Sequence, residues 1–299
     1  MFLVFTPFRY FFIRSYLIIL SFLFSISNFY LFWLYIEVLI LLFIGFSYTI
    51  FSNRYTQLIV YFLIQTLASF RILVFYTLGY PSLFCMFLFL KLGIFPFFSW
   101  YVNVLYRFPS SLLLLRGTLH KLPPLLLLGI VATTSNVALL VLTSLLTLVV
   151  GGFFILSVID FRYLLVVSSM ANNRFLVLGI ISGRYSGFFI FYVLYFITMA
   201  LSLYILDNFI KPLLIGQSTK TFSILFITFL LLNIAALPPL PIFLAKFLLI
   251  YEFLLIHSSF LGLIVLIVLA NVPIVVSYCQ LFIKLTTNCY SNVSVYFLR

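Results

Sequence analysis

Long apolar stretches separated by short polar segments run along the whole chain. A helix that crosses a bilayer needs about 20 consecutive apolar residues, and segmenting the chain on that length yields about eleven candidate spans. The predicted spans are 14–27, 29–51, 56–78, 82–101, 112–131, 136–158, 163–182, 187–208, 221–237, 241–257 and 260–285. The ninth and tenth also fit one segment interrupted around LPPLP (237–241). This pattern predicts an all-α, polytopic transmembrane helix bundle.

Three lysines interrupt the apolar pattern, and each lies within five residues of a proline. The combinations are Lys91 with Pro96, Lys121 with Pro123 and Pro124, and Lys246 with Pro238, Pro239 and Pro241. A charge at bilayer depth costs about 2.5–3.5 kcal/mol on insertion scales, and proline removes a backbone donor from the helix. Interrupted helices at membrane depth are tolerated where they line a cavity. We therefore predict helix breaks at these prolines and a polar path through the membrane.

The composition supports the membrane interpretation. Hydrophobic residues make up 66% of the 299 residues and charged residues only 7%, whereas a soluble domain is about 25% charged. No polar stretch is long enough for an aqueous domain, so we expect one transmembrane domain over residues 1–299. The net charge of +12 comes from basic residues mostly at span ends. We interpret them as headgroup contacts and do not expect nucleic-acid binding.

The distribution of basic residues between the two sets of connections predicts the orientation. One side has Arg9, Arg14, Arg54, Arg107, Arg116, Arg162, Lys211 and Lys220, and the other has Arg184, Lys284 and Arg299. Positive charge concentrates on the cytoplasmic or matrix side. We therefore expect the N-terminus on that side and the C-terminus on the opposite side.

Glu37 is the acid deep in the first half of the chain, within FWLYIEVLI (32–40). It is either a protonated or hydrogen-bonded packing residue or the partner of a buried lysine, because charges inside a membrane usually have a partner. Lys91 is the natural candidate. Lysine suits such a pair because its pKa can be moved toward the working pH, whereas arginine stays charged.

Four further residues are auxiliary candidates for the polar path. His120 precedes Lys121, and either relays protons or packs through hydrogen bonds. Asn172 and Asn173 lie in a polar patch that either bonds between helices or hydrates the path. Glu252 follows Lys246 by nearly two turns and either ends the path or lies near the interface.

Motifs for cofactors and metals are missing from the sequence. It has no P-loop, no GxGxxG ahead of a helix, no HExxH and no CxxC among its three cysteines. We therefore expect the chain to bind no nucleotide, flavin, iron–sulfur cluster or metal and to move ions without performing redox chemistry itself.

Several segments, in order along the chain, resemble those of the antiporter-like membrane subunits of respiratory complex I. The matching segments are FWLYIEVLI (32–40), YFLIQTLAS (61–69), KLGIFPFFSW (91–100), HKLPP (120–124), LLVVSSMANNRFLVLG (164–179) and ALPPLPIFLAKFLLIYE (236–252). In its short length the chain resembles the animal members of this family, which have about eleven helices because three N-terminal helices have been lost. The resemblance implies an inverted-repeat bundle truncated at its N-terminus.

The resemblance also implies a function. Glu37 and Lys91 would form the coupling pair, Lys121 would be the central lysine and Lys246 the terminal lysine of a hydrated proton path. The chain would be a proton-translocating part of an NADH:ubiquinone reductase, with NADH, FMN, iron–sulfur clusters and ubiquinone bound by other subunits. Its expected partners are other membrane-arm subunits, including antiporter-like subunit 4, and phospholipids such as cardiolipin. Its expected location is the mitochondrial inner membrane, with the N-terminus in the matrix and the C-terminus in the intermembrane space.

The chain departs from the family pattern at three places. Phe98 and the pair Asn172 and Asn173 stand where the family often has histidine, and Pro241 replaces a small residue. Two alternatives remain open, namely a stand-alone cation/proton antiporter and a structural spacer without its own proton path.

Overall fold

The computed structural model describes residues 2–50, 55–132, 137–156, 160–205, 207, 229–258, 261–280 and 283. Helices make up most of these residues, and none of them lies in a β-strand, so the prediction of an all-α fold is confirmed for the described part of the chain. The chain divides into two compact units, Met1–Asn136 and Val137–Arg299. The expected single transmembrane domain stays a prediction.

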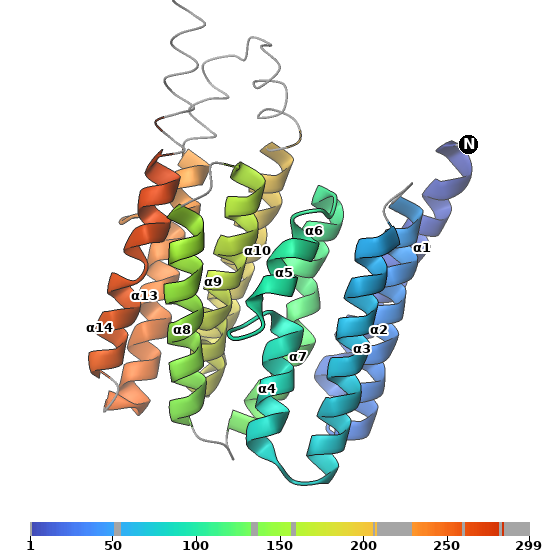
Figure 1. Ribbon diagram of the computed structural model, residues 1–299, viewed down its shortest axis with the longest axis horizontal. Helices are drawn as coiled ribbons and strands as arrows, with labels where there is room; N and C mark the ends of the chain where they lie inside the picture. Colours follow the sequence, from blue (N-terminus) through green and yellow to red (C-terminus); the bar gives the residue numbers. More distant parts are fainter. Residues whose placement is uncertain are drawn as a thin grey trace, which may run out of the picture. The chain divides into compact units, whose positions relative to one another are not determined.

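The first unit is a series of helices that pack on their neighbours in the sequence (Figure 1). Its elements are α1 (Phe2–Phe22), η1 (Leu23–Ser25), α2 (Phe29–Ile50), α3 (Tyr55–Thr77), α4 (Pro81–Leu92), α5 (Phe98–Leu105), α6 (Ser110–Gly117), η2 (Leu119–Lys121) and α7 (Leu122–Ala132). α2 packs between α1 and α3, and α4 contacts both α3 and α7. The contact of α4 with α7 brings the first two lone lysines into one region.

The predicted span 82–101 is interrupted, because α4 ends at Leu92 and α5 begins at Phe98. Gly93 follows α4 with φ of 70°, a left-handed conformation that glycine adopts without a steric cost. A Cβ on Gly93 would lie 2.4 Å from the Tyr101 side chain. Pro96 lies inside the interruption, so this break depends on glycine at its start and proline at its centre.

The predicted span 112–131 is also interrupted, but before its prolines. The short 3₁₀ turn η2 joins α6 to α7, and Pro123 and Pro124 lie in the first turn of α7. The first N–H groups of a helix have no partner inside the helix, so proline is tolerated there. These two prolines therefore start a helix where the sequence predicted a break at their own positions.

The second unit is built around α9 (Phe161–Ile181), which contacts α8 (Val137–Leu156), α10 (Tyr185–Ile205) and α13 (Pro241–Ile256). Within the stretch Arg162–Ile181, 94% of the residues in an 18-residue window are buried. The shorter α14 (Leu261–Leu269) packs on α8. Because α9 is enclosed by its neighbours, its polar side chains have to find partners inside the unit.

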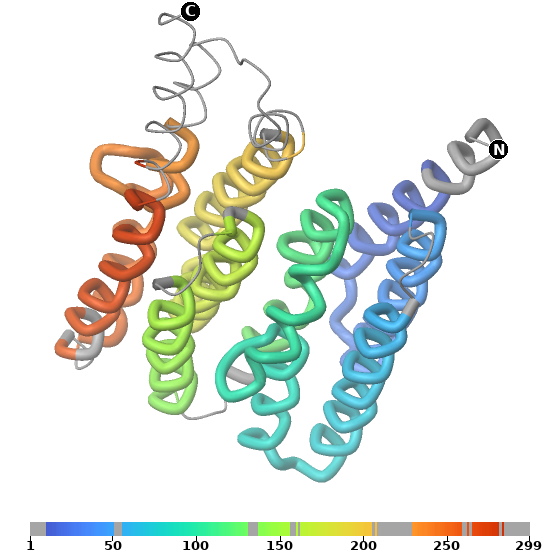
Figure 2. The backbone as a smooth tube through the Cα atoms, turned by 45° about the horizontal axis from the view of Figure 1, so that its top comes forward, coloured from blue at the N-terminus to red at the C-terminus, as the bar shows by residue number. Residues whose placement is uncertain are grey.

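The LPPLP segment lies in a break ahead of α13. A helical stretch ends at Ile234, residues 235–240 are non-helical, and α13 begins at Pro241. The backbone can be followed leaving the helix before α13 in Figure 2. Pro238 and Pro239 lie in the break, whereas Pro241 is the first residue of the helix. The first part of the ninth predicted span (221–228) and the end of the eleventh fall outside the described residues, as do Arg54, Lys211, Lys220, Lys284 and Arg299.

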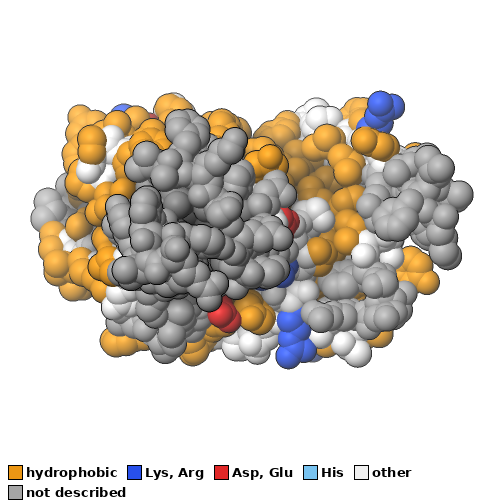
Figure 3. Space-filling model, turned by 90° about the horizontal axis from the view of Figure 1, so that it is seen from above, with side chains coloured by type: hydrophobic (Ala, Val, Ile, Leu, Met, Phe, Trp, Pro, Cys, Tyr) orange, Lys and Arg blue, Asp and Glu red, His pale blue; other side chains and the backbone are white. Residues whose placement is uncertain are grey.

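Six helical stretches of the described part, one of them formed by α6, η2 and α7 together, are long and apolar enough to cross a membrane, judged by length and composition. They are Phe29–Ile50, Thr56–Thr77, Ser110–Ile130, Val137–Ile155, Arg162–Ile181 and Tyr185–Tyr204. Large hydrophobic side chains such as Phe153, Leu67 and Phe247 are exposed. These exposed apolar side chains fit lipid as their solvent. Figure 3 looks along the helices onto one end of the molecule, where charged side chains appear among the hydrophobic ones of the described residues.

Candidate functional sites

The structure places Lys91 and Glu37 side by side within the first unit. Lys91 Nζ, in the last turn of α4, lies 3.6 Å from Glu37 Oε1 on α2. The lysine side chain is 2% exposed and the glutamate 22%. A cation near a helix C-terminus interacts favourably with the helix dipole. Lys91 therefore has two sources of electrostatic support, the carboxylate and the end of α4.

The backbone of Lys91 is held by Arg116 from the last turn of α6. Arg116 Nη2 donates a hydrogen bond of 2.6 Å to the Lys91 carbonyl, and Gln65 Nε2 lies 3.5 Å from the same oxygen. That carbonyl is at a helix end, where the last C=O groups have no partner inside the helix. The Arg116 guanidinium also lies 5.1 Å from the centre of the Tyr61 ring.

The sequence-based assignment of Arg116 to a loop is wrong. Its side chain is 1% exposed and lies within the first unit. It caps the interrupted helix instead of meeting lipid headgroups, so it does not contribute to the orientation that the loop charges predict.

His120 is hydrogen-bonded at both ring nitrogens. The Tyr16 hydroxyl lies 2.9 Å from Nδ1 and the Tyr61 hydroxyl 2.9 Å from Nε2. A neutral imidazole donates at one nitrogen and accepts at the other, so both contacts fit a neutral ring. His120 and Lys91 also line a common cavity of about 10 Å³, close to the smallest space of about 10–15 Å³ that holds a water molecule.

Lys121 is fully buried and lies against an aromatic ring. Its Nζ is 5.3 Å from the centre of the Tyr101 ring on α5. Tyr101 is the residue that a Cβ on Gly93 would displace. The break after α4 and the position of Lys121 are therefore coupled through one tyrosine.

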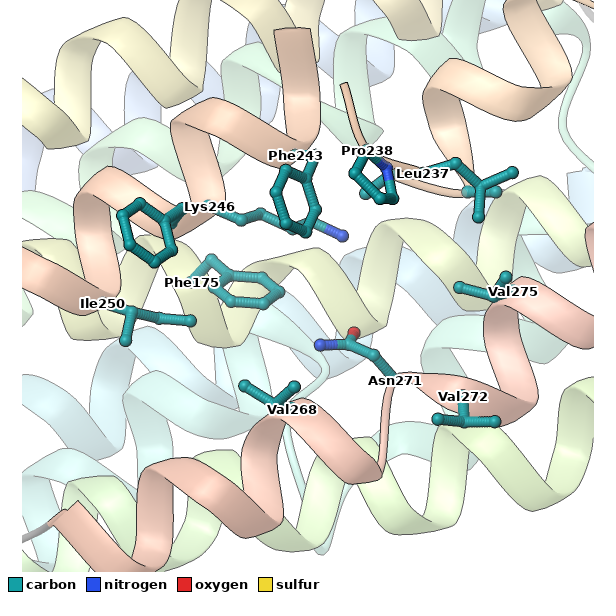
Figure 4. A pocket seen from close by; sticks show the side chains of 13 residues that line it. Phe175, Leu237, Pro238, Phe243, Lys246, Ile250, Val268, Asn271, Val272 and Val275 are labelled. Carbon is teal, nitrogen blue, oxygen red and sulfur yellow. The ribbon is translucent and has the colours of Figure 1, made fainter. Parts of the chain in front are cut away.

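Lys246 lies in the second unit, in the second turn of α13, beside a cavity of about 430 Å³. Its Nζ is 4.8 Å from the centre of the Phe175 ring on α9. Figure 4 shows Lys246, Phe175 and Asn271 pointing toward one another, with Pro238 of the helix break close by. The cavity is lined mainly by apolar side chains from α9, the break, α13 and the region 268–275.

Arg174 contacts Phe175 and Asn271, two residues that line this cavity, and shares the Phe175 ring with Lys246. Its Cζ lies 4.3 Å from the centre of the Phe175 ring, and Nη2 donates a hydrogen bond to Asn271 Oδ1. The side chain is 1% exposed, and its Nε and Nη1 have no hydrogen-bond partner among the described residues. The second lysine site thus contains a second buried cation.

The remaining candidates of the second unit have different partners. Glu252 is buried, and its Oε1 accepts a hydrogen bond of 3.0 Å from Ser186 on α10. A Cβ on Gly187 would lie 2.3 Å from Glu252 Oε2, so this glycine allows the carboxylate to approach α10. Glu252 is therefore buried within the unit beside the first turn of α10, and both interpretations of this residue stay predictions. Asn172 and Asn173 are also buried in α9.

Arg116 and Arg174 are the two residues that sequence reasoning missed. A signal was available for Arg174, because an arginine thirteen residues into the helix Phe161–Ile181 is as anomalous as a lone lysine. For Arg116 the signal was weaker, because its position near an expected span end made a loop residue the simpler interpretation. Among the described residues, no group of three or more His, Cys, Asp or Glu side chains could hold a metal ion.

Comparison with known proteins supports the resemblance stated from the motifs. The chain is 33% identical over 169 residues to NADH-ubiquinone oxidoreductase chain 2 of Sibirionetta formosa, which covers 54% of this chain and 48% of that protein. It is 34% identical over 167 residues to the protein of the same name from Gallus gallus, with the same coverage. No family model matches the chain. The chain spans about half the length of the curated relatives it matches.

A solved structure confirms the fold. A chain of respiratory complex I from Thermus thermophilus with bound aureothin matches with a TM-score of 0.72, covering 85% of this chain and 64% of that chain. The sequence identity is 21%. The expected resemblance to complex I membrane subunits is confirmed by the sequence relatives, and the structural match shows that the helical fold is shared.

Proposed function

We propose that this chain is chain 2 of a mitochondrial NADH:ubiquinone oxidoreductase and conducts protons within the membrane arm. The other subunits would carry out NADH oxidation and ubiquinone reduction. The proposal places the chain in the mitochondrial inner membrane, with its N-terminus in the matrix and its C-terminus in the intermembrane space. Its neighbours would be other membrane-arm subunits, including antiporter-like subunit 4, and phospholipids such as cardiolipin.

The observation that carries the proposal is the pair of Lys91 and Glu37 at the end of an interrupted helix. When Glu37 moves away or takes up a proton, Lys91 loses its counter-charge and the protonated lysine becomes less stable. It can then pass its proton to a neighbour. His120 lines the same small cavity. Because its two ring nitrogens are bonded to Tyr16 and Tyr61, the proton would reach the histidine through one of these hydroxyls.

Lys121 and Lys246 would carry the proton further, and both lie next to helix breaks. Free carbonyl and N–H groups at such breaks are able to bind water. Asn172, Asn173 and Glu252 are proposed as auxiliary polar groups of the second unit. His120 and the two asparagines would replace the histidines that the family often has.

The test is made in the assembled membrane complex with Lys91→Ala and Glu37→Gln. We expect both variants to lower the proton pumping that accompanies NADH oxidation. Arg71→Gln, which removes an exposed cation from α3, is the matched control and should leave pumping unchanged. Unchanged proton-to-electron stoichiometry and turnover in both variants would rule out the proposed role.

One observation favours a structural spacer as a second candidate. Both ring nitrogens of His120 are occupied by tyrosines, and Lys121 is fully buried against Tyr101. A density map that shows ordered water near Lys91, Lys121 and Lys246 would support the proton path. Dry surroundings at all three lysines would support the spacer. A stand-alone antiporter is distinguished by a native gel, because the proposed subunit migrates only in a very large assembly.

A further inference from the structure

The charges around the large cavity of the second unit do not balance. Lys246 and Arg174 lie against the same Phe175 ring, and both side chains are less than 10% exposed. No carboxylate of the described residues lies within 4 Å of either cation. Glu252, the acid on α13, accepts its hydrogen bond from Ser186 instead. Two like charges that share a poorly hydrated site repel each other unless an anion lies between or beside them.

Arg174 also has spare hydrogen-bond capacity. A guanidinium presents five N–H donors, and only Nη2 is used, toward Asn271. Nε and Nη1 are buried and find no partner in the part of the chain that the structure describes, a condition that costs free energy for a charged group. The site therefore favours an acceptor with negative charge.

The cavity beside these cations is large and apolar. Its volume of about 430 Å³ lies within the range of about 300–1,000 Å³ typical of small-molecule sites. Val268 of α14 and Val272 and Val275 of the helical stretch 272–280 line one side, on either side of the turn at residues 270–271. Phe243 and Ile250 of α13 line another side (Figure 4). The apolar walls thus suit a hydrocarbon chain, and the end of the cavity at Lys246 suits a negatively charged headgroup on that chain.

We propose that this cavity binds a long-chain fatty acid, with the carboxylate at Lys246 and Asn271 near Arg174 and the acyl chain along the valines. A phospholipid fits less well because its phosphate belongs in the headgroup layer. Arg174 is seven residues from the end of α9, roughly 10 Å along the helix at about 1.5 Å per residue. A fatty acid has one acyl chain and a small carboxylate, so it reaches that depth without burying the second acyl chain that a phospholipid carries. This inference goes beyond the proposed function and does not depend on proton transfer.

The test uses the wild-type chain in its native membranes, labelled without NADH so that pumping plays no part. A photoactivatable palmitate is compared with its methyl ester, which has the same chain and no charge. We expect the acid to label peptides containing Val268, Val272 or Phe243 about tenfold more than the ester, the difference of one charge-assisted hydrogen bond. Equal labelling by acid and ester, or none at these peptides, would overturn the proposal.

Variants locate the head of the ligand. Lys246→Gln and Arg174→Gln should each lower acid-specific labelling, whereas Lys246→Arg should retain it and shows that the site still forms. Arg71→Gln removes an exposed arginine of the other unit and serves as the control, with labelling unchanged. Labelling of the same peptides by a photoactivatable phosphatidylglycerol in preference to the fatty acid would contradict the proposed occupant.

Discussion

The lysine at the end of α4 and the lysine near the start of α13 are both buried beside a broken helix, yet their surroundings differ in charge. Lys91 lies 3.6 Å from a carboxylate, in the last turn of its helix. Lys246 is in the second turn of its helix and shares an aromatic ring with a second cation. The helix dipole favours a cation at the first position and not at the second.

The space around the two lysines differs as well. The cavity beside Lys91 is about 10 Å³ and that beside Lys246 about 430 Å³. A lysine close to a proline therefore predicts that a helix is interrupted nearby. It does not predict whether the protein supplies a negative charge beside the lysine. The first site supplies its own counter-charge, and the second leaves room for one from outside the described residues.

The largest effect is expected from Gly93→Ala, which disturbs the helix break after α4 that positions Lys91. A Cβ there meets Tyr101 at 2.4 Å and the backbone is left-handed, so we expect a loss of about 2–5 kcal/mol. The yield of assembled complex on a native gel and its thermal unfolding measure the loss. Gly79→Ala is the matched control, because Gly79 is also left-handed but has nothing within 4 Å. Equal effects of the two substitutions would show that contact with Tyr101 is unimportant.

Replacing the buried arginine beside each lysine tests whether the two sites differ in how their positive charges are balanced. Arg116→Gln leaves the Lys91 carbonyl with only the long contact to Gln65, and should destabilise the assembly by about 1–3 kcal/mol. Arg174→Gln loses one hydrogen bond but also removes a repulsion, so its effect should be smaller. Thermal unfolding of both variants provides the comparison. A larger loss for Arg174→Gln would contradict the account of the second site.

A smaller effect is expected when the second site receives an acid of its own. Asn271→Asp turns the acceptor of Arg174 into a carboxylate, and charged hydrogen bonds exceed neutral ones by about 1 kcal/mol. We therefore expect a modest rise in thermal stability together with the loss of fatty-acid labelling. A lower stability with labelling retained would show that the two cations need no additional negative charge.

The sequence predicted the helical class, the break after Lys91 and the pairing of that lysine with Glu37. These depend on local features, namely apolar length, glycine and proline, and the rarity of buried acids. The break near Lys121 lies before Pro123 instead of at it, because proline is accommodated in a first helical turn. The roles proposed for the lysines remain predictions.

The contacts of the two arginines could not be predicted from the sequence. The bond from Arg116 to the carbonyl of Lys91 joins residues 25 positions apart, and the bond from Arg174 to Asn271 joins residues 97 apart. Both depend on which helix faces meet, and an apolar pattern that runs all round a helix does not specify its facing side. The sequence pattern therefore identified the three lone lysines, but neither the two buried arginines nor their partners.

The central claim is that Lys91 carries protons, and Lys91→Arg tests it most directly. Arginine keeps the positive charge opposite Glu37 but does not release its proton, so the complex should assemble normally. The measurement is the number of protons translocated per NADH oxidised in sealed vesicles, with Arg71→Lys as the charge-conserving control. We predict that Lys91→Arg lowers this ratio, or lowers turnover and pumping together, while the control matches the wild type. A wild-type ratio at wild-type turnover in Lys91→Arg would contradict the claim.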